Sequence, residues 1–135
     1  MSTACAALLR SYLVPRALPL PDADGRVTLV FDARHRVQLR EGADGRAVVR
    51  ARLVDLPPFG VRRDALLVDI ARHAVIAATA PRQPAPACVV DAREEAVWLQ
   101  LLHAPDDTTA GFAAALDGFV GWLAFWKRTL ERISP

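Results

Sequence analysis

The sequence has few residues that can bind a metal ion or form a disulfide. Its 135 residues include only two cysteines, Cys5 and Cys88, and three histidines. The cysteines form neither a C-x-x-C pair nor a zinc-binding spacing. We therefore expect free thiols, as in a reducing cytoplasm, with no metal site and no cofactor.

Motifs for catalysis are also missing. Neither of the glycine-rich phosphate-binding patterns, G-x-G-x-x-G and G-x-x-x-x-G-K-[ST], occurs. Asp69 and His73 lie four residues apart in a predicted helix, and such a pair can orient an imidazole for base catalysis. An enzyme using His73 is one hypothesis. However, catalysis needs a constellation of groups, and no serine, cysteine or second histidine lies at a helpful spacing. We predict that the protein is not an enzyme.

No apolar run is long enough for a membrane-spanning helix. The longest run, 111–126, contains Asp117 and is shorter than the ~20 residues that such a helix needs. Residues 1–16 have no basic residue before their apolar stretch, and Arg10 interrupts that stretch, so they do not fit an export signal. The sequence thus predicts a cytoplasmic protein with no membrane contact.

The length and composition are those of a single folded domain, 1–135. Hydrophobic residues make up 53% of the chain and charged residues 24%, which is typical of a soluble globular protein. The net charge is only +2, but it is unevenly distributed. Residues 1–63 hold 11 arginines and 6 acidic residues, whereas residues 64–135 hold 6 basic and 9 acidic residues.

Hydrophobic periodicity predicts three helices and five strands. The pattern predicts a first helix over 3–14, a second over about 62–78, and a closing helix that begins near Asp107 or Thr108. Alternating segments at 24–32, 35–42, 47–56, 88–92 and 96–104 predict strands. We therefore expect an α+β fold in the order α-β-β-β-α-β-β-α, with an antiparallel five-stranded sheet covered by helices.

The first three strands have one apolar face and one arginine-bearing face. Arg36, Arg40, Arg50 and Arg52 lie on the second face. One alternative is a small nucleic-acid-binding or regulatory domain that uses this face. Proteins that bind single strands stack bases on aromatic side chains, and we expect none on this face. A solvated face, or a docking surface for an acidic peptide, is the favoured interpretation.

The segment 96–104 carries apolar residues at both alternating sets of positions. Val97, Leu99 and Leu101 form one set, and Trp98 and Leu102 belong to the other. We therefore expect this last strand to be covered on both faces.

The second helix is apolar almost all round. A helix with so little polar surface is buried on more than one side. Because the domain core can cover only one side, a second subunit is expected on the other.

The closing helix holds five of the nine aromatic residues, and its side chains divide into two groups. At 100° per residue, one group forms a stripe that we expect to be core: Phe112, Leu116, Phe119, Leu123, Trp126 and Leu130. Phe125 falls on the opposite side, near Ala114, Gly118 and Gly121. We predict that Phe125 is partly exposed or contacts another chain.

The element order and several segments resemble the class I type III secretion chaperones, the Tir-chaperone family. The resemblance covers about residues 3–132. The segments that carry it are DGRVTLVFDARHRVQLRE, DGRAVVRARLVDLP, ALLVDIARHAVIA, ACVVDAREEAVWLQLLHAPDD and FAAALDGFVGWLAFWKRTL.

The resemblance implies a homodimeric cytoplasmic chaperone without catalytic activity. It implies binding of the N-terminal segment of a secreted effector, which wraps around the dimer as an extended chain and is kept soluble and competent for secretion. Apolar patches on the first helix and the sheet would hold the segment, and strand addition can contribute. The implied effector-binding residues are Leu9, Tyr12, Leu13, Val30, Val48, Arg50, Arg52 and Val54. The implied dimer interface comprises Leu67, Ile70, Ala71, Ala74, Val75 and Trp98.

Overall fold

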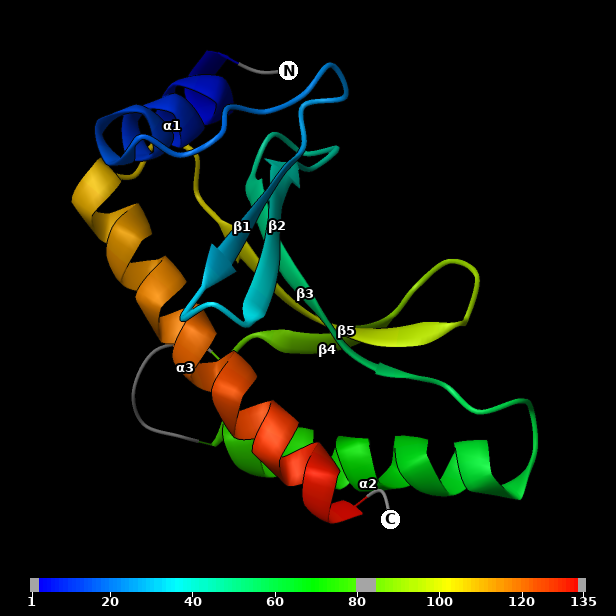
Figure 1. Cartoon of the computed structure of the whole chain (residues 1–135). Coiled ribbons are helices and arrows are strands. Elements are labelled where there is room, and N and C mark those ends of the chain that lie inside the picture. Colours follow the sequence, from blue (N-terminus) through cyan, green and yellow to red (C-terminus); the bar gives the residue numbers. More distant parts are fainter. Residues whose placement is uncertain (1–2, 80–84, 134–135) are drawn as a thin grey trace.

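The computed structural model describes residues 3–79 and 85–133 and shows three helices and one sheet (Figure 1). The helices are α1 (Thr3–Leu13), α2 (Val61–Ala78) and α3 (Thr109–Ile133), and a short 3-10 turn, η1 (Val14–Arg16), follows α1. The strands are β1 (Val27–Phe31), β2 (His35–Glu41), β3 (Ala47–Asp55), β4 (Ala87–Val90) and β5 (Ala96–His103). The predicted order and fold class are confirmed.

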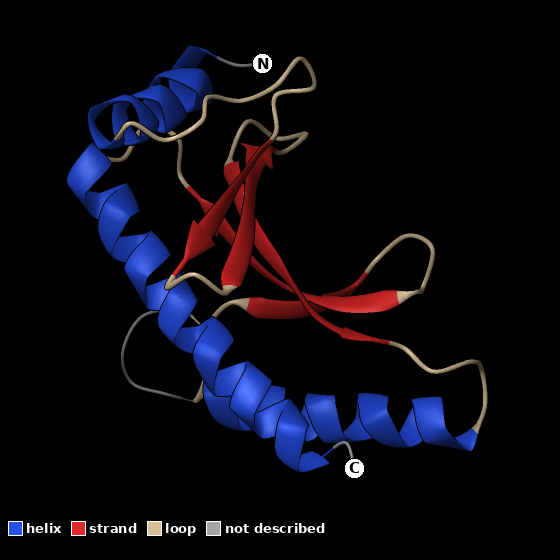
Figure 2. Cartoon of the chain, viewed as in Figure 1, coloured by secondary structure: helices blue, strands red, loops and turns tan. Residues whose placement is uncertain are grey.

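All five strands form one antiparallel sheet in the order β1-β2-β3-β5-β4. The predicted turn at Asp44-Gly45 joins β2 to β3, and Gly45 adopts a φ of 85°, which glycine tolerates without strain. A bulge between Arg52 and Val54 shifts the register of β3 against β5. Figure 2 shows the resulting strongly twisted sheet, with α1 and α3 on one side and α2 alongside β4 and β5.

Helix α3 begins where the sequence predicted. The Thr108 side chain accepts a hydrogen bond from the Gly111 N–H at 3.0 Å, so Thr108 is the N-cap residue. By length and composition alone, α3 is the one helix in residues 3–79 and 85–133 that could cross a membrane. Seven of its residues are buried against the rest of the chain, as expected of a core helix.

The core lies between the sheet and helices α1 and α3. The predicted stripe on α3 is confirmed, since all six of its members are buried. Tyr12 of α1 packs edge-on against Phe112 of α3, with ring centroids 5.5 Å apart. Apolar side chains of β1, β2 and β3 complete the cluster, among them Val27, Leu39 and Val49.

His35 is a titratable group within this core. It is 4% exposed, and Lys127 Nζ lies 3.2 Å from its Nδ1. Burial lowers the pKa of His35 from its ordinary value of 6.5, and the charges of Lys127 and Arg34 lower it further, against a smaller opposing effect of Asp32. The folded protein therefore binds a proton at His35 less readily than the unfolded chain does.

Stability is consequently expected to depend on pH through His35. Neutral His35 makes its full contribution to the free energy of unfolding above pH 6.5, the pKa of the unfolded chain. As the pH falls below 6.5 toward the lower pKa of the folded protein, the unfolded chain takes up the proton first, and this contribution is lost. Urea unfolding at about pH 7.5 and about pH 5.5 measures this loss. The substitution His35→Gln, which removes the titration, should make the difference between the two pH values smaller; an unchanged difference would assign the pH dependence to other groups.

Candidate protein-binding surfaces

The outward side of α2 carries an exposed apolar stripe. Val61, Val68 and Val75 are 85%, 49% and 67% exposed. Residues seven apart lie only about 20° from one another around a helix, so these three side chains form one row. Ala71 and Ala78 are also exposed and lie beside this row. We name these five residues the α2 stripe.

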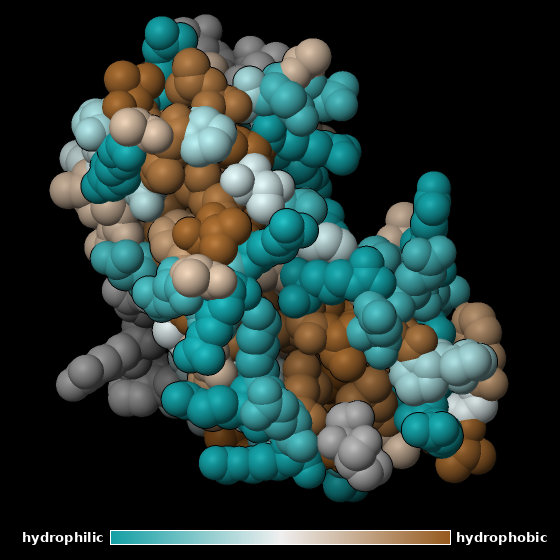
Figure 3. Space-filling model, in the orientation of Figure 1, coloured by the Kyte–Doolittle hydropathy of each residue, from teal (hydrophilic) through white to brown (hydrophobic). Residues whose placement is uncertain are grey.

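A groove runs along the α2 stripe, between α2 and the hairpin of β4 and β5. Its volume is about 320 Å³, and its lining residues are Leu67, Ile70, Ala71, Ala74, Cys88, Val90 and Val97. The surroundings are apolar enough that burial raises the pKa of the Cys88 thiol to about 11. Figure 3 shows brown, apolar surface to the right of centre, where Figure 1 draws β4, β5 and α2. Ala71 lies on both the stripe and the groove, so the two form one continuous apolar surface.

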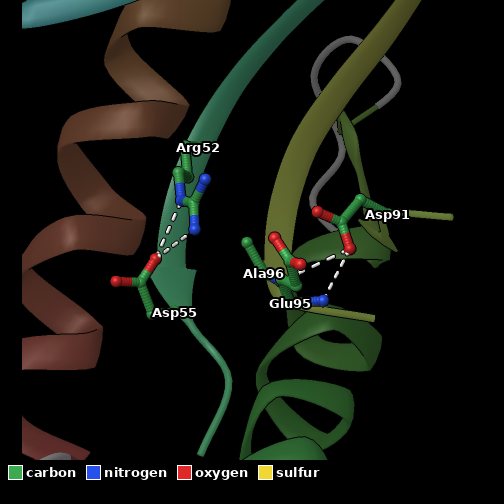
Figure 4. Close-up of polar contacts among 5 residues, drawn as sticks. All are labelled: Arg52, Asp55, Asp91, Glu95 and Ala96. Carbon is green, nitrogen blue, oxygen red and sulfur yellow. Dashed lines mark hydrogen bonds and ion pairs between the residues drawn. The ribbon is translucent and has the colours of Figure 1, made fainter. Parts of the chain in front are cut away.

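Arg63 anchors the start of α2 to this hairpin. It is buried and donates hydrogen bonds to the backbone carbonyls of Pro57, at 3.2 Å, and Glu94, at 3.0 Å. The ring of Phe59, itself largely exposed, stacks on its guanidinium at 4.1 Å. In the hairpin turn, Asp91 Oδ1 accepts from the N–H groups of Glu95 and Ala96 (Figure 4). The hydrogen bond from Arg63 to Glu94 thus joins the start of α2 to the hairpin turn.

The residues expected at a dimer interface divide into four groups. Ala71 and Val75 are exposed, and Leu67 and Ala74 are half-buried in the groove wall. Ile70 points inward and is buried. Trp98 pairs with Arg52 and Val89, so it lies on the opposite face of the sheet from Cys88 and Val97. Val61 and Val68 were not predicted at this interface, although their seven-residue spacing with Val75 is a signal in the sequence.

The residues expected to bind an effector are not all at the surface. Leu9 and Leu13 are 0% exposed, and Tyr12 and Val48 are also buried. The outward side of α1 instead carries Ala4, Ala7, Arg10 and Ser11. Val30 and Arg52 are exposed, and Arg50 and Val54 are half-buried, on the sheet.

The sheet face turned away from the helices carries the predicted arginines, and it also carries an aromatic residue. The guanidinium of Arg50 lies 4.1 Å from the ring centroid of Trp98, and that of Arg52 lies 5.9 Å from it. The expectation that this face holds no aromatic side chain was therefore wrong. The register of β3 against β5, which pairs Arg52 with Trp98, sets this arrangement. The expectation of a strand covered on both faces was also wrong, because Leu102 of β5 remains 40% exposed.

Phe125 is half-buried, so the prediction that its side chain is partly exposed is confirmed. Its ring packs edge-on against Trp122 and Trp126, with centroids 5.6 Å and 6.0 Å away. It lines a shallow hollow with Ile76 and Gly121. No second chain is part of this structure, so a contact of Phe125 with another chain stays a prediction.

The arrangement of His73 and Asp69 is not that of a catalytic pair. His73 Nδ1 lies 2.8 Å from the backbone carbonyl of Asp69, and the Asp69 carboxylate faces Arg72 at 3.9 Å. Within the described part of the chain, no three histidine, cysteine or acidic side chains converge as metal ligands do.

The fold matches solved structures, whereas no protein-family model and no curated protein matches the sequence. One match is the Yersinia pestis type III secretion chaperone SycH in complex with a stable fragment of YscM2, with a TM-score of 0.58 and 18% identity, covering 90% of this chain and 98% of that chain. A chain of the ExsC–ExsE complex matches with a TM-score of 0.61 and 23% identity, covering 95% and 96%. A chain of the HopA1–SchA chaperone–effector complex matches with a TM-score of 0.63 and 13% identity, covering 90% of this chain and 91% of that chain. The chain therefore has the fold of type III secretion chaperones over nearly its whole length.

Proposed function

We propose that this protein is a cytoplasmic type III secretion chaperone that binds the N-terminal segment of one effector, as a homodimer and without catalysis. The observation that carries the proposal is the fold likeness, which spans 90% or more of this chain in three cases. Two of these structures are complexes of a chaperone with another protein. Binding, rather than chemistry, is also what the apolar and arginine-bearing surfaces of this chain suit.

The proposed dimer interface is the α2 stripe together with its groove. Isolated apolar side chains are common on protein surfaces, but a contiguous apolar surface indicates an interaction site. Most soluble homo-oligomers are two-fold dimers in which the same patch meets itself. The α2 stripe suits such a contact, because two copies can pack their valine rows against each other while each groove receives side chains of the partner. Of the residues inferred from the family resemblance, Leu67, Ala71, Ala74 and Val75 belong to this interface.

The proposed effector-binding surface lies on the sheet. Val30 and Arg52 are exposed there and Arg50 is half-buried, whereas Val54 pairs with Val97 beyond the bulge of β3 and so lies on the opposite face. Strand β1 forms one edge of the sheet, where an extended segment can add as a further strand. The buried residues Leu9, Tyr12, Leu13 and Val48 have no surface to offer and are left out of this site.

Coexpression with a candidate effector encoded by a neighbouring gene tests the proposal. The effector should be recovered in a soluble complex with this protein, whereas the same effector lacking its N-terminal segment should not. The isolated protein should have the mass of a dimer in light scattering at tens of micromolar. A strict monomer under these conditions, together with no complex with the intact effector, would overturn the proposal.

A further inference from the structure

On the sheet face turned away from the helices, positive charge is concentrated on the neighbouring strands β2 and β3. Arg36 and Arg40 of β2 flank Gln38, which pairs with Arg50 of β3. Arg52 lies two residues beyond Arg50 on the same strand. Because directly paired residues, and residues two apart on one strand, share a face, all four guanidinium groups belong to one side of the sheet. We name Arg36, Arg40, Arg50 and Arg52 the arginine face.

Stacking on Trp98 holds the centre of the arginine face in place. The guanidinium carbon of Arg50 lies over the ring, 4.1 Å from its centroid. A stacked guanidinium uses its plane and keeps its N–H groups at the edge for acceptors. Arg50 Nε is buried and has no hydrogen-bond partner in the described chain. Buried donors in folded proteins are nearly always paired, so this unpaired donor sets Arg50 apart from an ordinary solvated arginine.

The carboxylates near the arginine face are already engaged. Asp55 Oδ1 accepts from Arg52 Nε at 2.8 Å, and Asp91 Oδ1 accepts from two backbone N–H groups of its own turn (Figure 4). Within residues 3–79 and 85–133, no ion pair involves Arg36, Arg40 or Arg50. Burial, followed by the charge of Arg40, lowers the pKa of Arg50, against a smaller opposing effect of Asp91. The face is therefore positively charged, partly desolvated and short of acceptors.

We propose that the arginine face binds an acidic, extended segment of the client polypeptide. This inference rests on the proposed function and names the chemistry of the partner. Carboxylates accept two parallel hydrogen bonds from a guanidinium, which is the acceptor geometry that a row of preorganised arginines selects. Val30 and Leu102 are 58% and 40% exposed, and their positions place them on the same face. A segment that mixes acidic and apolar side chains satisfies both kinds of contact.

The geometry favours a polypeptide over a nucleic acid. Proteins bind single strands by stacking bases on free aromatic rings. Trp98 is the aromatic residue that the structure places on this face, and the guanidinium of Arg50 occupies its ring. The apolar surface of Val30 and Leu102 also has no counterpart in a phosphate backbone. A nucleic acid would find charge here, but no stacking platform.

Fluorescence polarisation with a labelled peptide tests the inference. The probe is an extended peptide of about ten residues that alternates Glu with Val, long enough at about 3.3 Å per residue to cross the sheet. Its control replaces every Glu with Gln, and a single-stranded DNA oligonucleotide is the third probe. The variant carries Arg36→Glu and Arg40→Glu, and the matched variant carries Arg10→Glu and Arg132→Glu, two exposed positions on α1 and α3. Circular dichroism confirms that both variants are folded.

The Glu-Val peptide should bind the wild type, and its affinity should fall between about 50 mM and about 500 mM salt as ionic contacts are screened. The Arg36/Arg40 variant should lose about tenfold in affinity, whereas the matched variant should bind as the wild type does. Binding of the Gln peptide with equal affinity, equal loss in both variants, or preferential binding of the oligonucleotide would each overturn the inference. A client that binds the Arg36/Arg40 variant with the affinity it has for the wild type would also overturn it, while leaving the chaperone function intact.

Discussion

Replacing Phe119 with alanine is expected to lower the free energy of unfolding by about 3–5 kcal/mol. Phe119 lies at the middle of the α3 core stripe and is 1% exposed. Its removal leaves a cavity between α3 and the sheet, and a close-packed interior collapses only partly into such a space. Urea unfolding, at one fixed protein concentration because a dimer gains stability with concentration, measures the change.

Phe125→Ala is the matched control, because it removes the same side chain from the same helix. Phe125 is half-buried and lines an open hollow, so its removal leaves no closed cavity. We expect a clearly smaller loss of stability than for Phe119. Equal losses for the two variants would mean that α3 does not present its Phe119 side to the core as described.

The two sides of α3 were predictable because a helix has one fixed period. Spacing alone separated Phe112, Phe119 and Trp126 from Phe125, and the structure places the first three in the core. The strand order of the first three strands followed from short turns between consecutive segments. These features depend on residues close together in the sequence.

The errors concern contacts between distant segments. Alternation separates Trp98 from Val97, but it does not say which side of β5 continues the arginine-bearing side of β3. That depends on a pairing between segments more than forty residues apart. Similarly, an apolar side of α1 was visible in the sequence, but the sequence did not show that α3 and the sheet cover Leu9 and Leu13 completely.

The α2 stripe depends both on local periodicity and on contacts with distant segments. The apolar character of the helix was visible, and it indicated burial on two sides. The structure adds which side is left open, since Ile70 and Ala77 point inward and Val68 and Val75 point outward. The interface proposed here is therefore centred on Val68 and Val75 rather than on Ile70.

The double substitution Val68→Glu and Val75→Glu is expected to convert the proposed dimer into a folded monomer. A two-fold interface would contain four new carboxylates, and burying an unpaired charge costs several kcal/mol. The dissociation constant should therefore rise by about 100-fold or more. Both side chains are already exposed in the single subunit, so its fold should tolerate the change. Sedimentation equilibrium over a range of concentrations measures the dissociation, and urea unfolding checks the fold.

Ile76→Glu separates a specific interface from a general effect of charge on α2. Ile76 is as exposed as Val75, at 67%, but it faces the hollow beside Phe125 rather than the α2 stripe. This variant should remain a dimer if the stripe is the interface. Dissociation by Ile76→Glu with no effect of the double substitution would place the interface on the side of Phe125.

The arginine face lies on the opposite side of the sheet from the α2 groove. The monomeric Val68/Val75 variant should therefore still bind the Glu-Val peptide, so that self-association and client binding can be measured separately.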